Sequence, residues 1–189
     1  MADARPRLYL AGPDIFLPNA DEIARAKREL CARFGFAALH PFDNELHAAA
    51  PDAAARVYRA NLALLRRADG GIFNLTPFRS LSADVGTVFE LGFLAALERP
   101  VFGYGACAST LLERARAADA CARFDADDRC WRDGEGLRIE DFGRADNLMI
   151  DECLAASGGF ARKAADDESH DDLAGFARAL EAARAHFGR

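Results

Sequence analysis

The chain has 189 residues, of which 51% are hydrophobic and 29% charged, with a net charge of -6 and an isoelectric point near 5.3. This length and composition are typical of one globular domain, and the acidic balance argues against a nucleic-acid polymer or an acidic membrane surface as partner. No apolar run approaches the roughly 18 residues that span a bilayer, and residues 1–7 lack the apolar segment of a signal peptide. We therefore expect a cytoplasmic protein.

The five cysteines are odd in number and form no C-x-x-C pair, and only four histidines accompany them. Neither the cysteines nor the histidines show the spacing of a zinc site. The sequence therefore predicts structural thiols in a reducing compartment and no metal.

The first 104 residues alternate short apolar runs with longer helical patterns. We expect strands at 7–11, 36–40, 71–74 and 101–104, and helices at about 19–34, 53–68 and 85–98. Such an alternation is typical of a doubly wound α/β fold, a parallel sheet with helices on both faces.

The second half of the chain has a weaker pattern. Helices are expected near 110–122, 146–156 and 171–187, whereas residues 124–136 are polar and rich in turn formers. Their acidic residues lack the spacing of a calcium loop, so this segment is predicted to be a solvated surface loop. We expect a single domain over 1–189 with a helical extension from about residue 151.

The helix predicted at 85–98 carries Glu90 among Phe89, Leu91 and Phe93. Because it is apolar on nearly every face, it is expected to be buried on most sides. An unpaired buried carboxylate is costly, so Glu90 is predicted to face a polar cavity. The alternative is that it reaches solvent or pairs with an arginine.

Ligands of open parallel sheets bind beyond the carboxyl ends of the strands. The loops at that edge contain Asp14, Phe16, Glu45 and Arg79, and Asp84 stands at the start of the helix with Glu90. Asp84 could equally be a helix cap. It lies about 9 Å along the helix axis from Glu90, which suits two separate roles on one small ligand.

Gly86 lies one turn before Glu90 and lets a ligand approach the helix backbone closely. The first strand ends in A-G-P-D, so the phosphate cradles G-x-G-x-x-G and G-x-x-x-x-G-K-[ST] are absent, as is a G-x-S-x-G elbow. Carboxylate chemistry remains. An ionised glutamate can attack an anomeric carbon and form a sugar ester that a second nucleophile opens with net retention.

Five short motifs from Tyr9 to about Ile150 resemble the nucleoside 2-deoxyribosyltransferase family. They are Y-L-A-G-P-D at 9–14, P-F-D-N at 41–44, N-L-T-P-F-R at 74–79, D-V-G-T-V-F-E-L-G at 84–92, and D-F-G at 141–143 with N-L-M at 147–149. The resemblance implies a flavodoxin-like fold and no cofactor. It also implies that Glu90 attacks C1′ of a 2′-deoxynucleoside, that Tyr9 orients this carboxylate and that Asp84 binds the deoxyribose. Tyr9 could otherwise be ordinary strand packing.

The same resemblance implies that Asn147, with Met149 beside it, reaches the sugar of a neighbouring subunit, which predicts a homo-oligomer. Without the resemblance, Asn147 reads as the cap of the helix that follows it. Phe16 is a candidate lid or stacking residue for the base, with simple core packing as its alternative.

Two positions depart from the best-known bacterial pattern. Asn61 stands where some members have an aspartate that protonates the departing base, and an amide is no comparable acid. Glu45 stands where some have glutamine, so the hydrogen-bonding pattern offered to the base differs.

The expected activity is base exchange between 2′-deoxynucleosides and free nucleobases through a deoxyribosyl ester on Glu90. One alternative is an N-glycosidase acting on 2′-deoxynucleoside 5′-monophosphates, although residues 12–19 include no Ser, Thr, Lys or Arg to hold a phosphate. Another is a non-catalytic nucleoside sensor that keeps the pocket without the chemistry.

Overall fold

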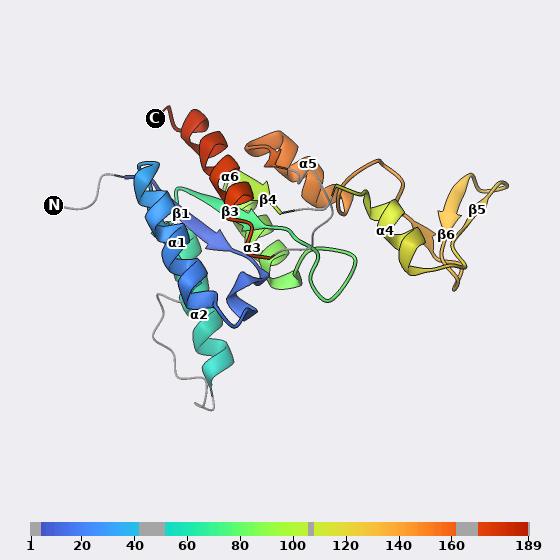
Figure 1. Cartoon of the computed structure of the whole chain (residues 1–189), viewed down its shortest axis with the longest axis horizontal. Helices are drawn as coiled ribbons and strands as arrows, with labels where there is room; N and C mark the ends of the chain where they lie inside the picture. Colours follow the sequence, from blue (N-terminus) through green and yellow to red (C-terminus); the bar gives the residue numbers. More distant parts are fainter. Residues whose placement is uncertain (1–4, 42–51, 106–107, 162–169, 189) are drawn as a thin grey trace.

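Five strands lie side by side in one parallel sheet, in the order β2-β1-β3-β4-β8 (Figure 1). The computed structural model describes residues 5–41, 52–105, 108–161 and 170–188. The strands are β1 (Arg7–Ala11), β2 (Ala37–Leu39), β3 (Gly70–Asn74), β4 (Val101–Tyr104) and β8 (Phe160–Ala161). This 2-1-3-4-5 order is flavodoxin-like, so the predicted fold class is confirmed. Sequence reasoning missed β8, because two residues are too few to show a period.

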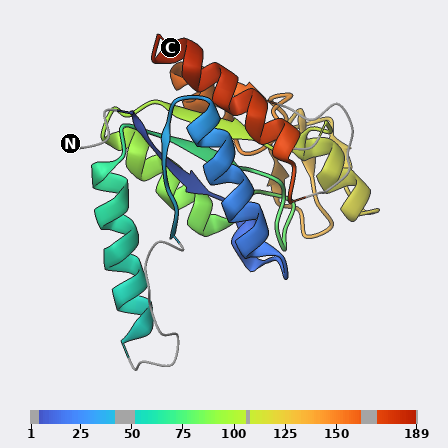
Figure 2. The ribbon, with the colours of Figure 1, turned by 60° about the vertical axis from the view of Figure 1, so that its left-hand side comes forward.

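Helices cover both faces of the sheet, as Figures 1 and 2 show. The helices are α1 (Ala20–Arg33), α2 (Ala53–Arg67), α3 (Val85–Ala96), α5 (Leu148–Ser157) and α6 (Leu173–His186). Successive strand residues point to opposite faces, so Leu8 and Leu10 pack with α1 and α6, and Tyr9 and Ala11 pack with α2, α3 and α5. Tyr9 therefore lies on the face covered by the helix that carries Glu90.

The chain leaves β1 through Gly12 and a short 3-10 helix, η1 (Pro13–Phe16). A Cβ at Gly12 would lie 2.4 Å from the Cβ of Asn74 and 2.5 Å from Oδ1 of Asp14. Glycine at this position therefore lets the end of β3 and the η1 turn approach each other closely. This approach brings the loops after β1 and β3 together at the carboxyl edge of the sheet.

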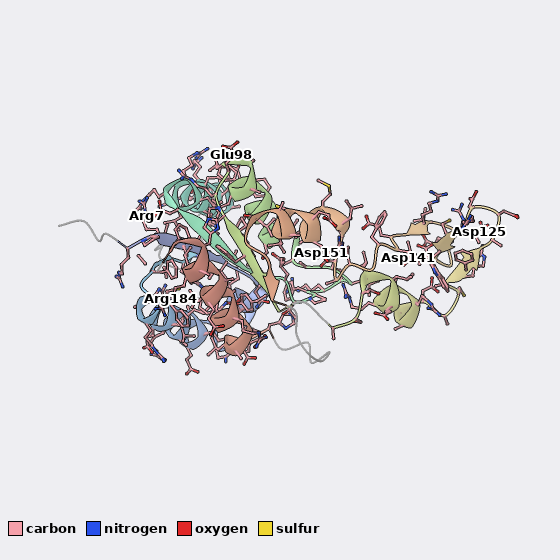
Figure 3. All side chains as sticks on the ribbon, turned by 90° about the horizontal axis from the view of Figure 1, so that it is seen from above. Arg7, Glu98, Asp125, Asp141, Asp151 and Arg184 are labelled. Atoms are coloured by element: carbon pink, nitrogen blue, oxygen red, sulfur yellow. The ribbon has the colours of Figure 1, made fainter. Side chains whose placement is uncertain are left out.

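The segment between β4 and α5 forms an arm that projects from the body of the protein (Figure 1). The arm consists of α4 (Leu111–Ala118) and an antiparallel sheet of β5 (Arg123–Asp125), β6 (Cys130–Arg132) and β7 (Arg138–Ile139). In Figure 3, Asp125 marks its far end and Asp151 lies on the body.

The segment 124–136 is solvated as predicted, since none of its residues is buried, but it is a hairpin and not a loop, because local contacts organise it. The rings of Phe124 and Trp131 meet edge to face at 5.8 Å, and Arg116 lies over Trp131 at 4.2 Å. Arg132 bonds Asp125 across the hairpin at 2.9 Å. The polar composition that suggested a loop instead supplies cross-strand pairs.

The outer face of α3 is uncovered. Only Thr87, Leu91 and Leu94 of this helix are buried, whereas Val85 is 84% exposed and Phe89 52% exposed. The expectation that the helix is buried on most sides is therefore wrong for the single chain. Its inner stripe alone packs on the sheet.

The described residues contain neither a membrane-spanning helix nor a metal-binding cluster. None of the helices in these ranges combines the length and apolar character needed to cross a membrane. Within the same ranges, no three His, Cys, Asp or Glu side chains are grouped closely enough to hold a metal ion.

Candidate active site

The site lies where the sheet order reverses. β1 is flanked by β2 on one side and by β3 on the other, and ligands of such sheets bind at this switch point, beyond the carboxyl ends of the strands. The η1 turn, the loop after β3 and the start of α3 all follow strands at this edge. Side chains from α2 and α3 close the site from one face.

Glu90 is held by two donors from two different elements. The phenol of Tyr9, on β1, donates a 2.6 Å hydrogen bond to Oε1 of Glu90. Nδ2 of Asn61, on α2, donates to the same oxygen at 3.4 Å. Tyr9 has no exposed surface, so its hydroxyl is fixed by the packing of its ring. Among the described residues, no Lys or Arg forms an ion pair with Glu90.

The surroundings of Glu90 raise its pKa towards neutral pH. Burial raises the pKa of Glu90 to about 7, and the negative charge of Asp84 adds to the rise. The hydrogen bonds from Tyr9 and Asn61 act in the opposite direction. Burial, with the nearby Glu90 charge, raises the pKa of Tyr9 well above its ordinary value, so Tyr9 remains a donor. Near pH 7 the carboxylate can therefore change its protonation state.

Asp84 caps α3 through one of its two oxygens. Oδ2 accepts from the backbone N–H of Thr87 at 2.9 Å and from its hydroxyl at 3.0 Å. No hydrogen bond to Oδ1 is found within the described ranges. The alternative role of Asp84 as a helix cap is confirmed, and Oδ1 takes no part in this cap. A Cβ at Gly86 would lie 3.1 Å from Oδ2, so glycine leaves room beside this carboxylate.

Phe16 ends η1, in the loop after β1, and is 54% exposed, so it is not a core residue. Its ring stacks on Phe78 with centroids 5.3 Å apart and planes 9° from parallel. The guanidinium of Arg79 lies 5.5 Å from Phe16 and 4.7 Å from Phe78. The guanidinium therefore lies close to both rings. Such a platform suits a flat, π-rich ligand.

Asp14 belongs to the framework below the site. It is 3% exposed, its Oδ2 pairs with Nζ of Lys27 at 2.7 Å, and its Oδ1 accepts from Asn74 at 3.2 Å. Both oxygens are engaged inside the protein, which does not fit the substrate-binding role predicted for Asp14. Glu45, the other predicted base contact, lies outside the described residues.

Asn147 caps α5 and is held from its other end. Its Oδ1 accepts from the N–H of Met149 at 3.0 Å, and its Nδ2 donates to Glu140 at 2.6 Å. The alternative role as a helix cap is confirmed. Met149 is 72% exposed, whereas Asn147 is half-buried.

Sequence reasoning missed several residues that shape the site. Asp146 is buried and accepts from Ser82 Oγ and, at 2.8 Å, from Ala83 N, which fixes the chain entering Asp84. Lys27 was not singled out because the helix that carries it contains many charged residues. Its position on the apolar face of that helix could have predicted a buried lysine. The stacking of Phe78 on Phe16 depends on contact between two loops and has no local signature.

Comparisons with known proteins agree with this geometry. The sequence profile of the family described as nucleoside 2-deoxyribosyltransferase matches residues 8–149. An uncharacterized protein of Schizosaccharomyces pombe is 34% identical over 168 residues, which cover 82% of this chain and 80% of that protein.

Two solved structures share the fold. The 2-desoxiribosyltransferase from Leishmania mexicana is 29% identical, with a TM-score of 0.63 over 93% of this chain and 97% of that one. A conserved protein from Enterococcus faecalis, 17% identical, has a TM-score of 0.54 over 94% of this chain and 98% of that one. The second likeness concerns the fold alone.

Proposed function

The chain belongs to the nucleoside 2-deoxyribosyltransferase family, and from this premise we propose that it exchanges the base of a 2′-deoxynucleoside for a free nucleobase. The observation that carries the proposal is the 2.6 Å hydrogen bond from a fully buried tyrosine to a carboxylate in an apolar helix. A binding module has no need for a buried carboxylate that is costly to ionise. A nucleophile does.

The proposed reaction has two displacements at C1′. Glu90 forms a bond to C1′ while the bond from C1′ to the base nitrogen breaks, and the base leaves with the electron pair and takes up one proton. The nitrogen of the incoming base then attacks C1′, releases its proton and returns the carboxylate. The exchange is neutral in protons overall, and two inversions give net retention.

Three other residues have proposed roles in this scheme. The open Oδ1 of Asp84 accepts a hydrogen bond from a deoxyribose hydroxyl, and the bare backbone at Gly86 leaves space for the sugar. The exposed ring of Phe16 stacks with the base. The absence of a 2′-hydroxyl eases formation of the oxocarbenium-like state, so deoxynucleosides are the expected substrates.

We also propose that the active unit is a homo-oligomer in which Asn147 reaches the site of a neighbouring subunit. Support comes from the apolar side chains left exposed on α3 and beside Asn147, namely Val85, Phe89 and Met149. Large apolar side chains that gather on an exposed surface are typical of a protein interface.

A base-exchange assay tests the function. Incubation with deoxyadenosine and cytosine is expected to yield deoxycytidine and adenine in equal amounts, and Glu90→Gln is expected to abolish the reaction. Glu98→Gln, an exposed position just past the end of the same helix, is the matched control and should keep full activity. Free deoxyribose without deoxycytidine indicates the hydrolase, and binding with unchanged substrates indicates the sensor.

A further inference from the structure

The two hydrogen bonds on Glu90 converge on one oxygen. Tyr9 reaches Oε1 from β1 and Asn61 reaches Oε1 from α2. Within the described ranges no hydrogen bond engages Oε2. The carboxylate is therefore asymmetric, because one oxygen is held by two donors and the other carries the open lone pairs.

We propose that Asn61 is a positioning residue for the nucleophile, which with Tyr9 holds Oε1 of Glu90 so that Oε2 is the oxygen that attacks C1′. The inference rests on the proposed function. The family resemblance aligned Asn61 with a residue that acts on the departing base. In this proposal Asn61 acts on the carboxylate of Glu90 instead. An amide suits this task, since it donates to a carboxylate at every pH and adds no charge.

The chemistry of the step explains why the bonds fall on the oxygen that does not attack. As Oε2 forms its bond to C1′, Oε1 becomes the carbonyl oxygen of the sugar ester. Two donors on Oε1 fix the plane of the carboxylate, which aligns the Oε2 lone pair with C1′. When the ester is opened, the charge returns to a carboxylate that the same donors stabilise.

The groups that face Glu90 come from three elements. Tyr9 lies on β1, Asn61 on α2 and Asp84 at the N-cap of α3, and Asp84 is the one carboxyl group among the three. Removing the Asn61 donor therefore raises the pKa of Glu90, and a carboxylate at position 61 raises it further through like-charge repulsion.

The test compares Asn61→Leu, which keeps the size of the side chain, with Asn61→Asp, which keeps its shape. The pKa of Glu90 is measured by NMR on protein labelled with 13C at the glutamate carboxyls and assigned with Glu90→Gln. Base exchange is measured across pH in parallel. Arg59→Ala, an exposed position on the same helix, is the control expected to change neither quantity.

We expect Asn61→Leu to raise the pKa of Glu90, to lower kcat about tenfold at pH 7 and to leave KM within about twofold. Asn61→Asp should raise the pKa by about one unit or more, with activity partly recovered above pH 8. An unchanged pKa with a higher KM in Asn61→Leu would place Asn61 at the base and overturn the proposal. A gain of kcat in Asn61→Asp would do the same, because it would show an acid acting on the leaving base.

The two readouts separate this inference from the proposed function. The titration of Glu90 requires no turnover. Its shift in the variants therefore tests the contact with Asn61 even if the wild-type protein exchanges no bases, and activity with an unshifted titration disproves the contact alone.

Discussion

Glu90 combines two properties that oppose each other, since a nucleophile must be ionised and burial favours the neutral acid. Because the pKa of Glu90 is about 7, its ionised, reactive form becomes the major form only as the pH rises above neutrality. We expect kcat/KM to fall tenfold for each unit of pH below about 6, reaching a plateau above about 8. Rates measured between pH 4.5 and 9 check this, and a flat profile down to pH 5 would contradict it.

The same shift makes the nucleophile a cost to stability. The folded-state pKa lies above the ordinary glutamate value of 4.5, so the folded protein binds more protons than the unfolded chain between these values. Stability therefore falls as the pH rises through that window. Glu90→Gln should therefore raise the free energy of unfolding by about 3 kcal/mol at pH 8 and by almost nothing at pH 4.

Urea unfolding of wild type and Glu90→Gln at the two pH values measures the difference. Glu98→Gln serves as the control, since its exposed side chain should leave stability unchanged at both. An equal gain in the free energy of unfolding at pH 4 and pH 8 would contradict this prediction. It would mean that Glu90→Gln stabilises the protein through packing and not through loss of the ionisable group.

At the scale of the elements, periodicity predicted the body of the protein well. The strands at 7–11 and 101–104 match β1 and β4 residue for residue, and α1 to α3 were each predicted within two residues. Tyr9 and Glu90, 81 positions apart, could be brought together only through the family resemblance. Hydrophobic pattern reports which face is buried, whereas partners across layers depend on tertiary packing.

The ion pair that joins α1 to the η1 turn could not be predicted from the sequence either, because it also depends on tertiary packing. Lys27 and Asp14 are each 3% exposed in their side chains and 2.7 Å apart, and the ammonium lies 5.4 Å from the rings of Tyr104 and Phe176. Removing one partner leaves a buried charge without compensation. Lys27→Met should therefore lower the free energy of unfolding by about 3 to 5 kcal/mol.

Denaturant unfolding of the double variant Lys27→Met with Asp14→Asn completes the cycle. Because the amide carries no charge, the double variant should recover part of the loss. A double variant less stable than Lys27→Met alone would show that Asp14 is held chiefly by Asn74 and the backbone around it.

At the scale of the whole molecule, the exposed apolar side chains of α3 form the surface that the proposed homo-oligomer would bury. Val85→Lys should shift the protein to a monomer in sedimentation experiments, because a lysine at a position buried on association is costly. Ala32→Lys, an exposed position on α1 across the sheet, is the control and should leave assembly unchanged. A wild-type protein that sediments as a monomer would contradict the proposed interface.

Sharing of the site between subunits has a sharper signature than assembly alone. Glu90→Gln and Asn147→Ala are each expected to be inactive, and each supplies the residue that the other lacks. If Asn147 acts across the interface, coexpression of the two variants restores native sites, to about a quarter of wild-type activity for a dimer assembled at random. If Asn147 acts within its own chain, every mixed site keeps one defect and no activity returns. Asn147→Ser retains an oxygen for the N-cap of α5, so it removes the contact with the neighbouring site without removing the cap. This variant should remain folded and still complement Glu90→Gln.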